Sequence, residues 1–444
     1  MYVCMKKKIC LMLSLGLLLQ GCGQAPAAQS DPRDIVQIPS EEMTGALEAS
    51  MMESESVPNG DGLGATGSTE MPAENGFAES KVLDSMEKSA DDAFAESQIW
   101  EPEIREITLA FAGDINFDDH WCNMVYYHSH AEALSDVIDE DYLECMRDAD
   151  LFWINNEFTY SDRGAPLEGK MYTFRAAPEN VGLLAEMGAD IVGLANNHVY
   201  DYGEDALLDT METLQNAGIL YVGAGHDLAE AMSPVYFDLD GFTVAYVAAS
   251  RAEKFKMTPQ ATETKAGILR CYDNTLFLEE IEEAAAHADY VIALPHWGTE
   301  YSTVLEEAQT QGAKAYIDAG ADAVIGAHSH CLQGLELYED KPVIYSLGNF
   351  WFNEKTLDTM MVVLHVTYET DNRVLVTDYA DQEQNRHDIA SAPRILSVET
   401  EIVPGTQAGY ITTMADTTEE RRRIFDYLEG ISEGVRIDDE GIVR

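Results

Sequence analysis

The most constraining feature of this sequence is a segment pattern that occurs four times. Each copy starts with Ala-Asp, continues with a short apolar run, and ends in side chains that can bind a metal. The copies start at Ala149, Ala189, Ala288 and Ala321. Apolar runs of this length without polar alternation are typical of strands buried on both faces. The pattern therefore predicts an α/β sheet whose strands end at one shared polar edge.

The residues that end these runs are strongly biased towards Asp, Glu, Asn and His. A fifth run, residues 107–112, lacks the Ala-Asp start but ends in the same way, at Gly113-Asp114. The four other runs end in Asn155-Asn156-Glu157, Asn196-Asn197-His198, Pro295-His296-Trp297 and His328-Ser329-His330. Because all five follow predicted strands, we expect these side chains to gather at one site.

These residues suit a divalent metal centre. The six candidate ligands are Asp114, Glu157, Asn197, His296, His328 and His330. Carboxylates mixed with neutral donors favour Mn, Fe or Zn over a calcium cage made of oxygens alone. Six protein ligands exceed the needs of one catalytic metal and suit two metals about 3.5–4 Å apart. We assign His198, which directly follows Asn197, as a general acid or base.

The rest of the chain predicts helices between these strands. Helical periodicity or helix-end signals occur over residues 131–146, 178–187, 204–217, 276–287, 305–318 and 417–428. Hairpins are expected over residues 235–248, around Asp240-Gly241, and over residues 360–377. Alternating strands and helices with added hairpins predict the α/β class with mixed sheets.

The first 22 residues are typical of an export signal. Three lysines, Lys6 to Lys8, precede an apolar run over residues 9–19 that is too short to span a bilayer. The run ends in Leu19-Gln20-Gly21-Cys22, which resembles a bacterial lipobox. That resemblance implies cleavage before Cys22 and lipidation of this cysteine. We therefore expect a lipid-anchored protein on the extracytoplasmic face of the cell membrane, with ordinary secretion as the alternative.

The charge of the chain limits which classes of partner it can bind. Residues 23–103 carry eighteen acidic residues and three basic ones, which predicts a disordered acidic linker. The whole chain has a formal net charge of -53, which argues against nucleic acid as a partner. An anionic substrate would have to meet local positive charge, from a bound metal or a few arginines.

Several ordered motifs resemble the CapA family of capsule-synthesis proteins, over about residues 104–352. They are Ala112-Gly113-Asp114, Asn156-Glu157, Ala195-Asn196-Asn197-His198, His296 to Tyr301, Gly326 to His330, and Tyr345 to Phe350. The resemblance implies a fold similar to the calcineurin-like metallophosphoesterases, which is a four-layer αββα sandwich with two mixed sheets. It also implies a role in making, exporting or anchoring poly-γ-glutamate. We expect the folded domain to cover residues 104–353, and residues 354–444 to add a hairpin and a helix that pack on it.

The resemblance also implies roles for single residues. Asp114 matches the first metal aspartate, Glu157 the bridging carboxylate and Asn197 the asparagine ligand. His198 matches the acid, and the remaining ligands are His296, His328 and His330. Two positions depart from the phosphoesterase pattern: Asn116 stands where a ligand histidine is usual, and Glu157 replaces an aspartate. Both departures bear on whether two metals bind.

Three further residues are candidates for substrate binding. Arg175 could grip a carboxylate or a phosphate, or form a structural salt bridge. Glu300 could bind substrate or orient His296. Asn349 could support the site or cap a turn. The polar residues Asp118, Asp119 and His120 are interpreted as a loop close to Asp114.

Two functions from different classes follow from these features. The first is a metal-dependent hydrolase that acts on a surface polymer such as poly-γ-glutamate, or on a phosphoester. The second is a non-catalytic assembly factor that binds polymer or capsule-synthesis subunits through a remnant site. His198 and the neutral ligands favour the hydrolase, whereas Asn116 and the negative charge favour the assembly factor.

Overall fold

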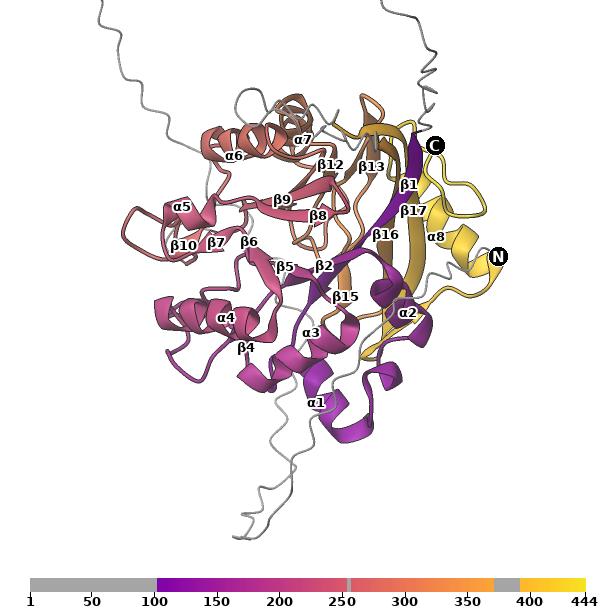
Figure 1. Cartoon of the computed structure of the whole chain (residues 1–444). Coiled ribbons are helices and arrows are strands. Elements are labelled where there is room, and N and C mark those ends of the chain that lie inside the picture. Colours follow the sequence, from indigo (N-terminus) through magenta and orange to yellow (C-terminus); the bar gives the residue numbers. More distant parts are fainter. Residues whose placement is uncertain (1–101, 254–256, 371–391) are drawn as a thin grey trace, which may run out of the picture. The chain divides into compact units, whose positions relative to one another are not determined.

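The computed structural model describes residues 102–253, 257–370 and 392–444. The predicted signal peptide, Cys22, the acidic linker and the hairpin strand at residues 373–377 lie outside these ranges. The described fold is built on two large sheets (Figure 1). The first sheet contains β1 (Glu103–Ile115), β2 (Leu151–Asn156), β5 (Ile191–Gly193), β6 (Leu220–Val222), β15 (Asn349–Trp351), β16 (Leu357–Thr370), β17 (Arg394–Ala408) and β18 (Ile411–Met414). The second contains β8 (Val235–Leu239), β9 (Phe242–Ser250), β11 (Tyr290–His296), β12 (Ala323–Ile325), β13 (Leu335–Tyr338) and β14 (Lys341–Ile344).

Both sheets are mixed, as predicted. In the first sheet β1, β2, β5 and β6 are parallel, whereas β16 pairs antiparallel with β1 and with β17. In the second sheet β9, β11, β12 and β14 are parallel, and β8 and β13 add antiparallel edges. Two short pairs, β3 (Thr159–Tyr160) with β4 (Arg175–Ala176) and β7 (Ala224–Gly225) with β10 (Gly267–Ile268), lie outside these sheets.

Most helices cover the outer faces of the two sheets (Figure 1). The helices are α1 (Cys122–His130), α2 (Glu140–Asp148), α3 (Val181–Met187), α4 (Glu204–Ala217), α5 (Leu228–Ala231), α6 (Thr275–Ala285), α7 (Glu307–Asp318) and α8 (Thr418–Gly430), with 3-10 turns η1 (Leu134–Asp136) and η2 (Pro178–Asn180). The helix predicted over residues 131–146 was wrong in extent. Asp139 accepts a hydrogen bond from Asp141 N and starts α2, whereas residues 122–130 form α1, which the sequence interpretation missed.

Side-chain alternation along the strands explains the four layers. Ala110 and Ala112 of β1 pack with the helices on one face, whereas Leu109 and Phe111 face the second sheet. Tyr246 of β9 belongs to this core between the sheets, and residues of the opposite face of β9 pack against α6 and α7. Three buried apolar layers therefore separate helix, sheet, sheet and helix, which confirms the predicted αββα sandwich.

The Ala-Asp pairs of the repeat have a structural role that the sequence interpretation did not foresee. The carboxylate of each aspartate accepts a hydrogen bond from a backbone N–H of the neighbouring parallel strand. The backbone N–H of the aspartate donates in return to the carbonyl of that same strand residue. The four carboxylate contacts are Asp150 with Thr108 N at 2.8 Å, Asp190 with Phe152 N at 2.9 Å, Asp289 with Thr243 N at 2.8 Å and Asp322 with Val291 N at 3.0 Å. The return backbone bonds span 2.7–3.1 Å. We call these contacts the aspartate clasps; they fix the register where the strands begin.

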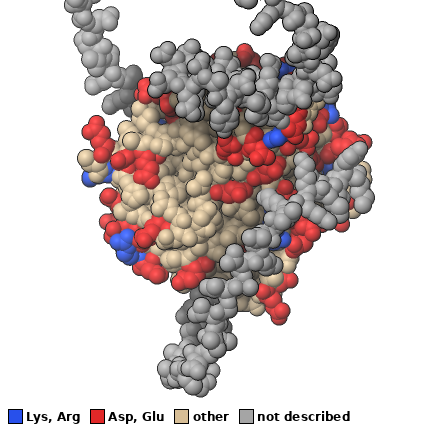
Figure 2. All heavy atoms as spheres, viewed as in Figure 1, with Lys and Arg blue, Asp and Glu red and all other residues tan. Residues whose placement is uncertain are grey.

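The segment after residue 353 is part of the same sandwich. β16 pairs with β1 from Met361 to Thr370, inside the first sheet. Helix α8 buries Ile424, Phe425 and Leu428 in the core between the sheets. Within the described ranges, no helix is both long enough and apolar enough to cross a membrane. The face shown in Figure 2 carries many Asp and Glu side chains and few Lys and Arg side chains.

Candidate metal centre

The polar residues that follow the parallel strands meet at one edge of the sandwich. Asp114 lies near the end of β1, and His296 is the last residue of β11. The other candidate ligands lie in the loops directly after β2, β5 and β12: Glu157, Asn197, His328 and His330. All six are buried, and the most exposed of them, His328, is 6 % exposed. The structure thus brings together every residue that the sequence suggested as a metal ligand.

The ligand atoms form two overlapping sets. Glu157, His296 and His328 make one set, and Asp114, Glu157 and His330 make the other. Within each set the ligand atoms lie within 4.8 Å of one another. Asn197 Oδ1 lies 2.7 Å from His296 Nε2, beside the first set. Glu157 is thus the residue that the two sets share.

Unsatisfied polar atoms show that these residues fit a divalent metal. Glu157 Oε1 lies 2.9 Å from His296 Nε2, and Asp114 Oδ2 lies 3.1 Å from His330 Nδ1. Neither contact has hydrogen-bond geometry, so both Glu157 oxygens, Asp114 Oδ2 and His328 Nδ1 are buried without a hydrogen bond among the described residues. Leaving such acceptors unpaired costs free energy. A cation bound between them would satisfy them, and ligands around a metal with bonds of about 2.1 Å lie at comparable separations.

The electrostatics of the site favour neutral rings at His296 and His328, beside paired carboxylates. Burial, together with the other histidines, holds the pKa of His296 and His328 well below the usual range, so both rings keep a free lone pair. Burial and the charge of Asp114 raise the pKa of Glu157 well above its usual range. Burial tends to lower the pKa of His330, but Glu157 and Asp114 raise it to about 9. A proton held by this carboxylate–His330 group is the one that a metal would displace.

The backbone near the site is crowded and strained. A Cβ at Gly113 would lie 1.9 Å from the carbonyl oxygen of Gly348, so only glycine allows β1 and the loop before β15 to approach. His328 and His330 have φ values of 100° and 55°, a region that residues with side chains rarely adopt. Strain of this kind persists where the surrounding structure holds it, and it places both imidazoles on the carboxylates.

Two asparagines orient the ligands. Asn155 Nδ2 donates to Asp114 Oδ1 at 2.7 Å and lies 3.4 Å from His296 Nδ1. Asn349, a candidate for substrate binding that we expected to support the site or cap a turn, is buried with Oδ1 2.8 Å from His330 Nδ1. Its position against a ligand histidine favours support of the site over substrate contact.

His198 lies beside this cluster in a buried charged chain. Its Nδ1 is 2.8 Å from Asp201 Oδ2, and Asp201 Oδ1 is 2.6 Å from Lys170 Nζ. Lys170 also pairs with Glu253 at 3.2 Å and donates to the carbonyl of Asn197. The side chain of Lys170 is 4 % exposed. The sequence interpretation missed both Lys170 and Asp201; the only signal was the position of Asp201 three residues after His198.

Comparison with known proteins shows where the chain belongs. The pattern of the family described as "Bacterial capsule synthesis protein PGA_cap" matches residues 108–354, which is more than half of the chain. The chain belongs to this capsule-synthesis family. The matched range contains every candidate ligand, together with His198, Lys170 and Asp201.

Individual relatives agree with the family assignment. The chain is 34% identical over 203 residues to "PGA biosynthesis protein CapA" of Bacillus subtilis (strain 168), covering 45% of this chain and 53% of that protein. It is 32% identical over 251 residues to "Capsule biosynthesis protein CapA" of Bacillus anthracis, covering 54% of this chain and 60% of that protein. The chain thus spans little more than half the length of these relatives. Among solved structures, the NAD nucleotidase of Haemophilus influenzae aligns over 76% of this chain and 58% of its own, at 12% identity and a TM-score of 0.33.

Two predicted substrate residues lie outside both ligand sets. Arg175 places its guanidinium 4.2 Å from the centre of the Tyr202 ring, and its contacts in the described chain are with this ring and with the carbonyl of Arg163. Glu300 is exposed, and its charge helps to raise the pKa of Glu157 and His330, so it lies near the mouth of the site.

The loop after Asp114 is structural in this family member. Asn116, the departure from the phosphoesterase pattern, uses Oδ1 to accept a hydrogen bond from Asp118 N at 2.8 Å. Asp118 accepts from Arg175 N at 2.7 Å, and Asp119 accepts from Ala177 N at 2.8 Å. These carboxylates therefore attach the segment around Arg175 to the end of β1, and the oxygen of Asn116 is already engaged.

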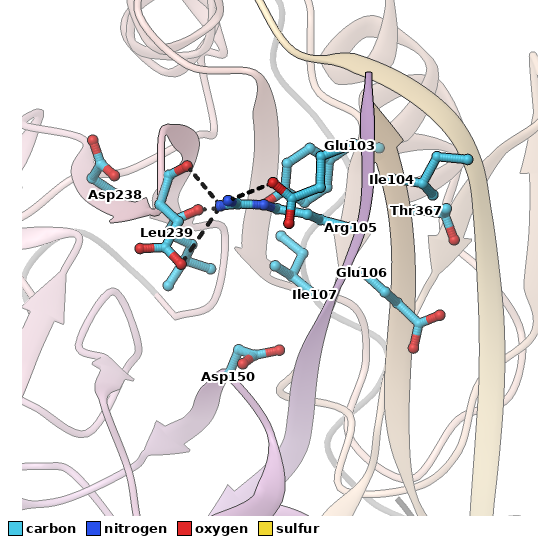
Figure 3. Close-up of a pocket in the computed structure, with 11 residues that line it drawn as sticks. Glu103, Ile104, Arg105, Glu106, Ile107, Asp150, Asp238, Leu239 and Thr367 are labelled. Carbon is cyan, nitrogen blue, oxygen red and sulfur yellow. Dashed lines mark hydrogen bonds and ion pairs between the residues drawn. The ribbon is translucent and has the colours of Figure 1, made fainter. Parts of the chain in front are cut away.

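A hollow lined by charged residues lies at the opposite edge of the sandwich. It has a volume of about 700 Å³ and opens between the start of β1 and the turn from β8 to β9 (Figure 3). Arg105 reaches across it and pairs with Glu103 at 3.0 Å and with Asp240 at 3.6 Å. Because it lies where the strands begin, it is separated from the metal centre by the length of the strands.

Proposed function

We propose that this chain is a metal-dependent hydrolase in capsule synthesis, anchored by a lipid on Cys22 at the extracytoplasmic face of the membrane. It would serve the making, export or anchoring of poly-γ-glutamate, and it would cut either this polymer or a phosphoester linked to it. Membership of the capsule-synthesis family and the printed names of the relatives support the biological role. The geometry of the cluster supports the hydrolase.

The observation that carries the proposal is the shared carboxylate. Glu157 belongs to both ligand sets and has two buried oxygens without hydrogen bonds in the described chain. A purely structural buried carboxylate is normally fully hydrogen-bonded. A pair of bound divalent ions would supply a water of lowered pKa and would stabilise negative charge on the attacked centre.

The residues of the chain supply proton transfer and orientation. Asp201 accepts a hydrogen bond from His198 Nδ1, which fixes the ring and leaves Nε2 to take up a proton and pass it to a leaving group. Lys170 pairs with Asp201 and so holds it in place. Asn155 holds Asp114 in a similar way, and Phe174 packs against the His198 ring with a centroid distance of 4.5 Å. The acid is thus held rigidly at the edge of the cluster.

The second candidate function is an assembly factor without turnover. It is favoured by Asn116, whose side-chain oxygen is engaged by Asp118 N and is not directed to a metal. With one ligand fewer, the set that contains Asp114 would bind its ion more weakly. Such a protein would bind polymer or capsule-synthesis subunits through the same edge.

Metal content of the full chain tests the proposal first. We expect two equivalents of Mn, Fe or Zn by elemental analysis, and a loss of at least one in His328→Ala. His287→Ala is the matched control, because His287 is an exposed histidine of the loop after α6 and should leave the content unchanged. No transition metal in the wild type would overturn the hydrolase.

Turnover separates the two candidate functions. Wild-type protein loaded with Mn²⁺ is assayed on bis(p-nitrophenyl) phosphate and on poly-γ-glutamate, with chain length as the readout for the polymer. His198→Ala should lower turnover by roughly a hundredfold or more while metal content stays the same. A wild type that binds metal but cleaves neither substrate would favour the assembly factor.

A further inference from the structure

Most basic side chains of the described chain are neutralised by carboxylates. The basic residues that form ion pairs with Asp or Glu, at N···O distances below 4.0 Å, are Arg105, Arg147, Arg163, Lys170, Lys314, Lys341, Arg394, Arg422, Arg423, Arg436 and Arg444. Two cations beside the metal centre differ. Within the described ranges, Lys355 and Arg175 form no ion pair and lie on tyrosine rings instead. A cation held by a ring keeps its charge available for an anion.

Lys355 is connected to the cluster through Tyr301. Its Nζ lies 3.5 Å from the centre of the Tyr301 ring, and that ring lies 5.7 Å from the ring of His330. Tyr301 is fixed from several sides: its N–H donates to Ser329 O at 2.6 Å, and its hydroxyl accepts from Asn353 at 3.4 Å. Lys355 itself is exposed, so its ammonium is accessible at the mouth of the site.

Arg175 is linked to His198 through its sequence neighbour Phe174. Its guanidinium lies on Tyr202, and its backbone N–H is held by Asp118. The preceding residue, Phe174, packs on the His198 ring. Arg175 is half-buried against Tyr202, which follows His198 by four residues in the sequence.

A row of aromatic rings joins the two cations. From His330 the row continues to Phe352 at 4.6 Å, from Phe352 to Phe174 at 5.6 Å, and from Phe174 to His198 at 4.5 Å. Phe352 and Phe174 are buried. The row runs beside the cluster, with Lys355 and Tyr301 at one end and Arg175 and Tyr202 at the other.

We propose that Lys355 and Arg175 form two anion-binding subsites, one at each end of this aromatic row, for an extended ligand that carries anionic groups at intervals. One group of the ligand would lie at the metal centre while its neighbours meet the two cations. The inference rests on the proposed function and specifies its substrate class as a chain of carboxylates or phosphates rather than a single small anion. In a chain of net charge -53, such local cations are what would allow a polyanion to approach.

A carboxylate near the row that has no partner would repel an anionic ligand, so its removal should tighten binding. Glu300, next to Tyr301, is exposed and has no ion pair in the described chain. Glu354, next to Lys355, accepts from the Cys122 thiol at 3.0 Å, and the Asp118 carboxylate accepts from the backbone N–H groups of His120 and Arg175. Glu300 is therefore the charge that opposes an anionic ligand, and Glu300→Gln should tighten binding.

Binding of defined anions tests the subsites without requiring turnover. The probes are a fluorescein-labelled octamer of γ-linked glutamate, single glutamate as competitor, and a polyphosphate of similar length, each with and without Mn²⁺. We expect the octamer Kd to rise roughly threefold in Lys355→Gln or Arg175→Gln and roughly tenfold in the double variant, because exposed charge pairs contribute modestly. Competition by single glutamate should be unaffected, and Lys355→Arg should bind as the wild type. Whichever polymer binds more tightly identifies the anion.

The matched control is Lys314→Gln. Lys314 also lies over a tyrosine, Tyr338, at 5.3 Å, but Glu336 neutralises it at 3.1 Å and it is on α7. An equal loss in Lys314→Gln, an equal loss for single glutamate, or no binding of either polymer to the wild type would overturn the subsites. Failure of the hydrolase alone would appear differently, as normal polymer binding without metal or turnover.

Discussion

Both edges of the sandwich contain clustered charged residues, but these residues are paired at one edge and largely unpaired at the other. Where the parallel strands begin, the aspartate clasps and the pairs of Arg105 satisfy carboxylates and cations with partners. Where the strands end, Glu157 and Asp114 keep unpaired oxygens, two histidines have strained backbones, and Lys355 and Arg175 have no carboxylate partner in the described chain. We infer that one edge stabilises the fold, whereas the other keeps its polar groups available for ligands.

Replacing Glu157 tests the ligand edge most severely. Glu157→Gln should lower the affinity for Mn²⁺ by at least about a hundredfold, because it removes the charge shared by both ligand sets. The metal-free variant should unfold at a higher urea concentration than the metal-free wild type, since one of two neighbouring buried carboxylates is gone. Calorimetric titration and urea unfolding measure the two effects. Equal metal affinity in the variant would mean that the two edges do not differ as described.

Lys170 is the exception at the ligand edge, because it is fully paired. Lys170→Met should lower the free energy of unfolding by about 3–5 kcal/mol, since Asp201 would stay buried without its partner. Adding Asp201→Asn should restore part of this loss. Urea unfolding of the single and double variants provides the measurement, with Lys265→Met, an exposed lysine, as the control. A loss below 1 kcal/mol would show that Lys170 is not part of a buried charged chain.

Removing a clasp should affect stability and leave the metal in place. Asp289→Ala takes away the acceptor of Thr243 N and should cost about 1–3 kcal/mol of the free energy of unfolding. Metal content should remain that of the wild type. Glu282→Ala on α6 is exposed and should change neither quantity. If Asp289→Ala loses metal while its stability is unchanged, the division between the edges is wrong.

The smallest expected effect is a pH dependence of the free energy of unfolding, caused by a histidine of the first sheet. His365 Nε2 lies 3.0 Å from Glu401, and this contact raises the pKa of His365 above its usual value. Its contribution is therefore fully present below the unfolded pKa of about 6.5 and is lost as pH rises through the folded pKa. The free energy of unfolding should fall by less than about 1 kcal/mol between pH 6 and 8, relative to His365→Gln. An increase over this range would contradict the assigned contact.

The sequence predicted the mixed α/β sheets and the position of the site because both depend on local patterns, whereas the four-layer arrangement was implied by the family resemblance. Buried parallel strands need uninterrupted apolar runs, and their C-terminal ends share one edge, so the five runs indicated which polar residues would meet. The hairpin of β8 and β9 and the helix α4 were confirmed for the same reason. The function of the Ala-Asp pairs was not predicted, since a hydrogen bond to a neighbouring strand depends on which strands are neighbours.

The sequence did not predict the residues whose roles depend on the path of loops. Lys170 reaches Asp201 through the segment between β3 and β4, which has no periodicity. Lys355 was missed because its partner Tyr301 is more than fifty residues away and comes from the other sheet's loop. The helix expected over residues 131–146 failed because Asp139 is an N-cap, which starts a new helix at Glu140.

The clasps also set a fixed length for each strand segment that serves the site. Glu157, Asn197 and His296 each lie seven residues after the clasp aspartate of their own segment, and His328 and His330 lie on either side of that spacing after Asp322. At about 3.3 Å per residue, seven residues extend across the whole sheet, from one edge to the other. A single inserted or deleted residue in this interval would turn the ligand to the opposite face. Sequence change in such proteins should therefore tolerate altered loop lengths after the ligands, while the interval from clasp to ligand stays constant.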